Sequence, residues 1–212
     1  MLDEESLQKA ADELAARDPH LRAVIEKHGY PPLWAREPGF PTLVKIILEQ
    51  QVSLSSAQAA YDKLLMRINP LTPEEFLTLD DAELKQIGFS RQKTRYCRIL
   101  AETIQSGELD LAELNQYSDQ EVSEILTALK GIGPWTAGIY LLMVLRRPDT
   151  WPKGDLALIT SMQEVKQLET RPDIEKAAEI ALAWRPWRSV AARILWHNYL
   201  SERAAKADFS GQ

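Results

Sequence analysis

The segment Leu129-Lys-Gly-Ile-Gly-Pro-Trp-Thr-Ala137 joins an acidic amphipathic stretch to an apolar one. Gly131 and Gly133 allow a tight turn here, and Ile132 between them can anchor that turn in a core. Pro134 suits the first turn of a following helix, where its missing N–H costs nothing. Such a turn presents backbone N–H groups, which can bind an anion without a charged side chain. An ordinary glycine connection between two helices would give the same pattern, so the turn alone does not decide the function.

Outside this turn, apolar residues recur at helical spacing, and the two-residue alternation of β-strands is almost absent. Thr72-Pro-Glu-Glu75 and Ser118-Asp-Gln-Glu121 are capping-box patterns that mark helix starts. Pro172 suits the first turn of a later helix, with Thr170 as its cap. Helices are predicted near 5–17, 20–28, 41–51, 54–68, 134–145, 172–184 and 187–207, among others. We therefore predict an all-α protein of about eleven short helices, with residues 1–212 folding as one compact unit.

The composition excludes several classes of protein. With 45% hydrophobic and 26% charged residues, the 212-residue chain has the balance of a folded protein. Its longest apolar run, 137–145, is nine residues, about half of the ~18 that indicate a membrane span. The acidic N-terminus lacks the apolar core of a secretory signal. A single cysteine, Cys97, excludes an internal disulfide and a multi-cysteine zinc or iron–sulfur site.

Asp155 lies twenty residues after Trp135 and ends the segment 146–155, which contains two prolines and a glycine. We expect Asp155 at the start of the next helix. Aspartate is common there simply as an N-cap. A capping position also fixes the direction of a carboxylate, so a structural and a catalytic role are compatible.

Together, this hairpin and aspartate resemble the helix-hairpin-helix DNA glycosylases, whose signature is an L-x-G-[IV]-G hairpin followed by a Gly/Pro-rich loop ending in aspartate. Ile46-Ile-Leu-Glu-Gln-Gln-Val-Ser53 is similar to the early helix and DNA-wedging turn of that family. Ile87–Lys93 and Arg185–Ser189 with Leu195-Trp196 are similar to segments of the 3-methyladenine DNA glycosylase II (AlkA-type) branch. The resemblance covers about residues 38–200 in order. It implies two helical lobes, a helix-hairpin-helix near 119–145, and an active-site cleft between the lobes.

The resemblance also implies a chemistry. The target base is flipped out of the duplex, and Asp155 stabilises the oxocarbenium-like sugar, orients the attacking water, or both. Bifunctional members carry a Schiff-base lysine where this chain has Trp135. The resemblance therefore implies a monofunctional enzyme that hydrolyses the glycosidic bond and leaves an abasic site.

Trp135 and Trp196 match base-pocket positions of the AlkA-type branch. Electron-rich rings favour cationic alkylated bases, of the 3-methyladenine and 7-methylguanine type, by cation–π attraction. Ile139 replaces one pocket aromatic of the branch, and Tyr140 is adjacent to it. The alternative is that both tryptophans only fill the core.

Several residues match DNA-contacting positions of the family. Gln51 falls where the branch places the residue that fills the gap left by the flipped base. The residues expected to contact DNA are Gln51, Ser90, Lys93, Gly131, Gly133 and Thr136. In the family the hairpin also binds a monovalent cation, Na⁺ or K⁺, through backbone carbonyls, which here would come from Thr127, Leu129 and Ile132. No cofactor is expected for catalysis, and neither zinc nor an iron–sulfur cluster is expected.

Two other functions remain open at this point. A helix-hairpin-helix can serve as a non-catalytic DNA-binding module, and related glycosylases act on oxidised, deaminated or mismatched bases. Asp155 at the expected spacing favours an enzyme over a plain binding module. Trp135 in place of lysine, and the absence of further cysteines, disfavour the branches for oxidised or mismatched bases.

The net charge of −6 argues against a nucleic-acid partner until its distribution is considered. Residues 1–124 hold 13 basic and 22 acidic side chains, whereas residues 125–212 hold 12 and 9. Phosphate contact would then rest on backbone amides and a small basic rim, with a shallow salt dependence. We expect a monomer that acts on duplex DNA containing alkylated bases, without a membrane partner, in the cytoplasm (at the nucleoid of a bacterium) or in a nucleus.

Overall fold

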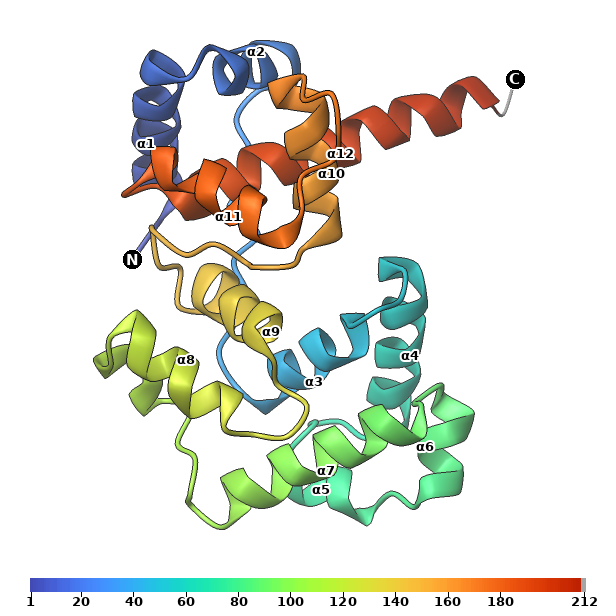
Figure 1. Ribbon diagram of the computed structural model, residues 1–212. Helices are drawn as coiled ribbons and strands as arrows, with labels where there is room; N and C mark the ends of the chain where they lie inside the picture. Colours follow the sequence, from blue (N-terminus) through green and yellow to red (C-terminus); the bar gives the residue numbers. More distant parts are fainter. Residues whose placement is uncertain (211–212) are drawn as a thin grey trace. The chain divides into compact units, whose positions relative to one another are not determined.

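The computed structural model describes residues 1–210, which fold into helices α1–α12 with short 3-10 and π segments and no strand (Figure 1). The prediction of an all-α protein is confirmed, and the described helices are close to the predicted number. Contacts divide the chain into two compact units, one of Met1–Ala35 with the residues from Arg146 onward, the other of Arg36–Leu145. None of the described helices is long and apolar enough to cross a membrane.

The first unit is built around its last helix. Its helices are α1 (Glu4–Arg17), α2 (Pro19–His28), α10 (Leu156–Lys166), α11 (Ile174–Ala181) and α12 (Arg188–Ser210), with a 3-10 turn at Leu182–Trp184. Helix α12 packs against α1, α2 and α10. It does so because its first turns are apolar on most sides: Val190, Ile194 and Leu195 are fully buried. This packing fixes α10, whose N-terminus carries Asp155.

The second unit contains the predicted hairpin. Its helices are α3 (Phe40–Glu49), α4 (Leu54–Arg67), α5 (Pro73–Thr78), α6 (Asp81–Ile87), α7 (Arg91–Gln105), α8 (Asp119–Thr127) and α9 (Pro134–Ile139), with a 3-10 turn at Glu113–Gln116. Helix α3 is apolar and packs against α4, α7 and α9. The predicted helix over 134–145 begins as expected but changes to π-helical geometry at Tyr140–Val144.

Polar caps define the helix starts, as the sequence suggests, with one correction. Ser118 forms a complete capping box with Glu121, and Thr72 accepts a hydrogen bond from the Glu75 N–H. The cap predicted at Thr170 is wrong. Asp173 caps α11 instead, because its carboxylate accepts from the Lys176 N–H at 2.7 Å.

Candidate active site

Asp155 is the N-cap of α10, as predicted. Its Oδ1 accepts a hydrogen bond from the Leu158 backbone N–H at 2.9 Å and one from the Trp196 indole Nε1–H at 3.2 Å. The residue is partly exposed. Two donors from two helices thus fix the carboxylate's direction, which suits a group that must face a developing positive charge.

The loop 146–155 is tied to the start of α12. The Ser189 hydroxyl, fully buried, accepts from the Thr150 N–H at 2.9 Å and donates to the Thr150 carbonyl at 3.1 Å. Arg188 holds Asp149 through its Nε, 2.8 Å from Oδ1. Sequence reasoning missed these anchors, because Ser189 and Arg188 lie more than thirty residues further along the chain. The loop that ends in Asp155 is therefore pre-organised by side chains of α12.

Trp196 lies in an aromatic cluster of the first unit. It is 8% exposed, and its ring packs edge to face against Trp34, with centroids 6.4 Å apart. Trp34 also packs against His197 and has a positive φ of 48°. The buried Arg193 donates from Nε to the Leu33 carbonyl at 2.8 Å, which holds the loop that carries Trp34. The cluster fixes the Trp196 ring so that its N–H meets Asp155.

The hairpin between α8 and α9 uses its two glycines differently. Gly131 has φ of +101°, and a Cβ there would come within 2.1 Å of the Tyr96 ring. Gly133 is the N-cap of α9 with an ordinary negative φ, and a Cβ there would meet no atom of the described residues within 4 Å. Ile132 is 4% exposed, which confirms that it anchors the turn. The space beside Gly133 leaves the hairpin backbone accessible to a ligand.

The turn after α3 is bound to this hairpin. Gln51, at φ of +57°, is exposed. The preceding Gln50 donates from Nε2 to the Gly131 carbonyl and to the Thr136 hydroxyl, both at 2.9 Å. Sequence reasoning singled out Gln51 and missed Gln50, whose neighbours are more than eighty residues away in the chain.

A family model described as "HhH-GPD superfamily base excision DNA repair protein" matches residues 44–187, which include the hairpin and Asp155. The chain belongs to this superfamily. DNA-3-methyladenine glycosylase 1 of Schizosaccharomyces pombe is 29% identical over 202 residues, or 90% of this chain and 87% of that protein.

A solved structure supports the assignment of the fold. The S. pombe 3-methyladenine DNA glycosylase Mag1, in complex with abasic DNA, superposes with a TM-score of 0.83 at 27% identity, covering 89% of this chain and 95% of that one. YfjP of Bacillus subtilis is 28% identical over 186 residues, or 84% of this chain. The chain spans only 65% of the length of YfjP.

The residues predicted for the base pocket differ in burial in the structure. Trp135 is partly buried, whereas Ile139 and Tyr140 are buried in the second unit. The Tyr140 hydroxyl has no hydrogen-bond partner among the residues that the structure describes, and burial raises its pKa to about 12. The roles of these residues in base recognition stay predictions.

The residues expected to contact DNA also make contacts within the protein. Ser90 caps α7, where its hydroxyl accepts from the Lys93 N–H. The Lys93 ammonium donates to the Leu48 carbonyl at 2.6 Å, and its partial burial lowers its pKa. Thr136 is 2% exposed and accepts from Gln50. Ser90 and Lys93 thus serve the start of α7 and the end of α3, and Thr136 binds Gln50. The contacts of these side chains with DNA stay predictions.

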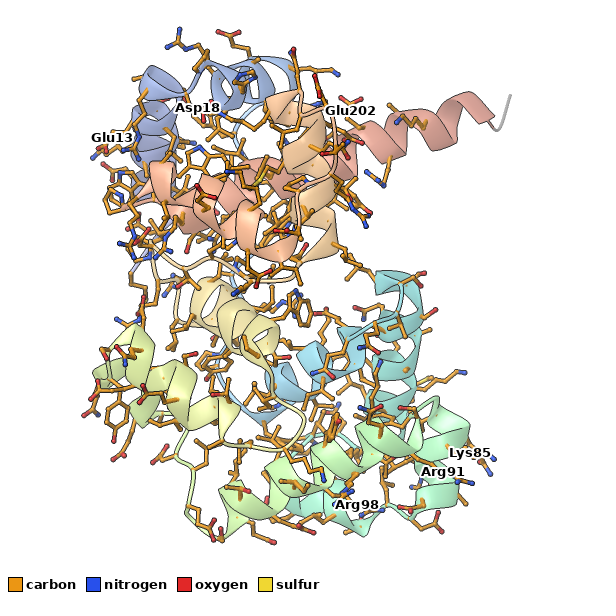
Figure 2. The ribbon with its side chains drawn as sticks, in the orientation of Figure 1. Glu13, Asp18, Lys85, Arg91, Arg98 and Glu202 are labelled. Carbon is orange, nitrogen blue, oxygen red and sulfur yellow. The ribbon has the colours of Figure 1, made fainter. Side chains whose placement is uncertain are left out.

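The first half of α7 carries four basic residues and no acidic one, and their side chains are of two kinds: Arg91, Lys93, Arg95 and Arg98. Arg98, which is labelled in Figure 2, donates to the Leu79 carbonyl and pairs with Asp81 at 2.8 Å, so it serves the packing of α7. Arg91 and Arg95 are exposed. The basic rim expected from the sequence is thus smaller than its count of charges suggests.

The hairpin carbonyls suit a monovalent cation chemically, because neutral oxygens are ligands for hard cations. The Leu129 carbonyl accepts from the Ile132 N–H at 3.1 Å, which leaves a second lone pair on that oxygen. The Thr127 hydroxyl donates to the Ser123 carbonyl, so the Thr127 side chain is engaged within α8. The cation role of these carbonyls stays a prediction.

Proposed function

We propose that this chain is a monofunctional DNA glycosylase that excises alkylated bases, of the 3-methyladenine and 7-methylguanine type, from duplex DNA. The observation that carries the proposal is Asp155, held by the Leu158 N–H and the Trp196 indole at the end of a rigid loop. Membership of the HhH-GPD superfamily and the S. pombe relative named for 3-methyladenine support it. The chain spans 65% of the length of YfjP, so the proposed activity rests on Asp155 and its two donors and not on that relative.

The proposed reaction breaks the bond between the base nitrogen and C1′ of the sugar. The bonding electron pair leaves with the base, so a cationic alkylated base departs neutral. Asp155 stabilises the positive charge that develops on the sugar, and its fixed direction avoids reorganisation during the reaction. A water then adds its oxygen to C1′ and passes a proton to the Asp155 carboxylate. The product is an abasic site.

Trp135 favours hydrolysis over strand cleavage. An indole has no amine that could form a Schiff base with the sugar, whereas a lysine would. Its electron-rich ring, together with that of Trp196, suits a cationic base by cation–π attraction. We propose that the chain acts as a monomer, uses no catalytic cofactor, and holds Na⁺ or K⁺ at most through hairpin carbonyls.

The second unit supplies the contacts with the duplex. Backbone N–H groups around Gly133 bind a phosphate, because nothing lies within 4 Å of where a side chain would be. Gln51 enters the gap that the flipped base leaves and hydrogen-bonds the orphaned partner base. Because these contacts need few lysines or arginines, binding should depend weakly on salt. Such an enzyme works where DNA is held, at the nucleoid of a bacterium or in a nucleus.

The test is incubation of the purified protein with methylated duplex DNA. Released bases are separated by chromatography, and abasic sites are detected by alkaline cleavage of the strand. We expect free 3-methyladenine and 7-methylguanine, strand breaks only after alkali, and no protein–DNA adduct after borohydride reduction.

Each other result has a defined meaning. Strand breaks without alkali, or a borohydride-trapped adduct, would overturn the monofunctional assignment. Binding to duplex DNA without release of any base would indicate the non-catalytic module instead. Release of hypoxanthine or uracil in preference to methylated bases would indicate a glycosylase for other lesions.

A further inference from the structure

Side-chain contacts tie the end of α3 to three other segments of the second unit. Lys93 donates to the Leu48 carbonyl, and Glu49 forms a two-pronged ion pair with Arg36, with distances of 2.9 and 3.0 Å. Gln50 supplies the third contact, to the hairpin. The Glu49 side chain is only 8% exposed, so this ion pair is shielded from water. The turn after α3, which carries Gln51, therefore follows a backbone segment whose position is fixed.

Gln50 differs from the other two anchors because it spans the hairpin. Its amide nitrogen carries two hydrogens. One is directed to the Gly131 carbonyl, in the turn, and the other to the Thr136 hydroxyl, inside α9. Both acceptors are 2.9 Å away, and Thr136 is almost fully buried. One side chain thus links the hairpin turn and α9 to the end of α3.

The residue next to Gln50 is the exposed Gln51, in the left-handed region at φ of +57°. A non-glycine residue persists in that region only where its surroundings impose it. The three anchors on Leu48, Glu49 and Gln50 provide such surroundings. As a result, the direction of Gln51 and the position of the hairpin backbone are set together.

We propose that Gln50 is a positioning residue that couples phosphate binding by the hairpin to insertion of Gln51 into the duplex. This inference rests on the proposed function. A phosphate bound near Gly133 places Gln51 at a fixed distance along the duplex. Gln51 is then already aligned with the base pair into which it inserts. Gln50 touches neither the sugar nor the base. It acts on the extrusion of the base and not on cleavage of the glycosidic bond.

The test compares two duplexes in single-turnover excision of one methylated base. In the first, the lesion faces its normal partner, so extrusion must break a base pair. In the second, the lesion faces an abasic position, so little opposes extrusion. We expect Gln50→Leu to slow excision about 10- to 100-fold on the first duplex, as for a misplaced positioning group, and less than about threefold on the second.

A double-variant cycle tests whether Gln50 acts through Gln51. Gln51→Ala should show the same preference for the second duplex, and Gln50→Leu/Gln51→Ala should be no slower than the slower single variant. Gln58→Leu is the matched control, because Gln58 makes the same kind of amide contact on the exposed face of α4, to Asp62 at 2.7 Å. It should excise from both duplexes at the wild-type rate.

Two results would overturn the inference. Equal losses on the two duplexes, or fully additive effects of the two variants, would mean that Gln50 only supports the fold. If Gln50→Leu does not fold, Gln50→Glu takes its place, because it keeps the shape of the side chain and replaces both N–H donors. The loss of excision rate on the first duplex is then compared with the loss on the second, as before. If the wild-type protein excises the base from neither duplex, the proposed function fails with the inference. Wild-type excision with equal losses removes the inference alone.

Discussion

Asp18 and Asp155 are two aspartates of the first unit with the same local contacts and different surroundings. Each caps a helix, and each accepts an indole N–H, Asp18 from Trp184 at 2.7 Å and Asp155 from Trp196 at 3.2 Å. Asp18, which is labelled in Figure 2, is 7% exposed and also pairs with Lys166 at 3.0 Å. Asp155 is partly exposed at the end of a loop. An aspartate that caps a helix and accepts an indole N–H therefore supports the fold at Asp18, and the same arrangement is available for chemistry at Asp155.

The two glycines of the hairpin, Gly131 and Gly133, also differ in whether the fold requires them. Gly131 is required by the fold, because its φ is positive and the Tyr96 ring occupies the space of a side chain. Gly133 is not required by the fold, because its φ is ordinary and its surroundings are open. Burial thus separates the two aspartates, whereas backbone conformation and the space for a side chain separate the two glycines.

The largest expected effect is at Asp155. Asp155→Asn keeps an N-cap of similar shape but removes the negative charge that would stabilise the sugar. We expect single-turnover base release to fall about 10³-fold, while DNA affinity and thermal stability stay near those of the wild type. Release of methylated bases is measured by chromatography, and DNA affinity by anisotropy titration.

Asp173→Asn is the matched control for this variant. Asp173 caps the neighbouring helix α11 through the Lys176 N–H and is exposed. It should release bases at the wild-type rate. Wild-type activity of Asp155→Asn would reduce Asp155 to a structural cap and remove the difference from Asp18.

The two glycines should respond oppositely to the same substitution. Gly131→Ala should lower the free energy of unfolding by about 3 kcal/mol, since it combines a strained φ with displacement of Tyr96. Gly133→Ala should leave that free energy nearly unchanged. Its methyl group would occupy the space proposed for a phosphate and hold the phosphate away from the backbone N–H groups, so binding to damaged and undamaged duplexes alike should weaken roughly tenfold, as for one hydrogen bond to a charged group. Urea denaturation measures the free energy of unfolding of both variants, and binding titrations measure their affinity for DNA. A lesion-selective defect of Gly133→Ala would contradict a phosphate-binding role.

These pairs also show what the sequence can and cannot predict. Helical spacing, caps and the Gly-x-Gly turn predicted the all-α fold and the start of α10 at Asp155, because those signals are local. The donor from Trp196, the anchor at Ser189 and the link from Gln50 to Gly131 join residues about forty to eighty positions apart. No local pattern encodes such contacts, since they depend on how the helices pack.

Asp18 illustrates the same limit, because the sequence does not show that it is buried. Asp18→Ala should lower the free energy of unfolding by about 2 to 4 kcal/mol, since the substitution removes a cap and leaves Lys166 unpaired. Base release per folded molecule should not change. Urea denaturation at pH 7 measures the first, and single-turnover excision the second.

The pH dependence of stability should report on Asp18 as well. Desolvation raises the pKa of this carboxyl, but the hydrogen bonds from Trp184 and Lys166 outweigh it and hold the pKa below the ordinary 3.8. A lowered pKa in the folded state adds stability that is present above pH 3.8 and is lost as the pH falls through the lower, folded value. Between pH 4 and pH 2, the wild type should therefore lose stability more steeply than Asp18→Ala. If the free energies of unfolding of the two proteins fall in parallel with pH, the charged form of Asp18 does not stabilise the fold.

The smallest expected effect comes from the two indoles. Trp196→Phe keeps an aromatic ring beside Trp34 but removes the N–H that orients Asp155, so single-turnover excision should slow about tenfold with DNA affinity unchanged. Trp184→Phe makes the same change beside the buried Asp18. It should cost about 1 kcal/mol of stability and leave excision unchanged. If Trp196→Phe instead lowers only stability, the indole packs without directing Asp155, and the two aspartates differ by burial alone. A loss of rate confined to Trp196→Phe means that the same hydrogen bond supports the fold at Asp18 and the reaction at Asp155.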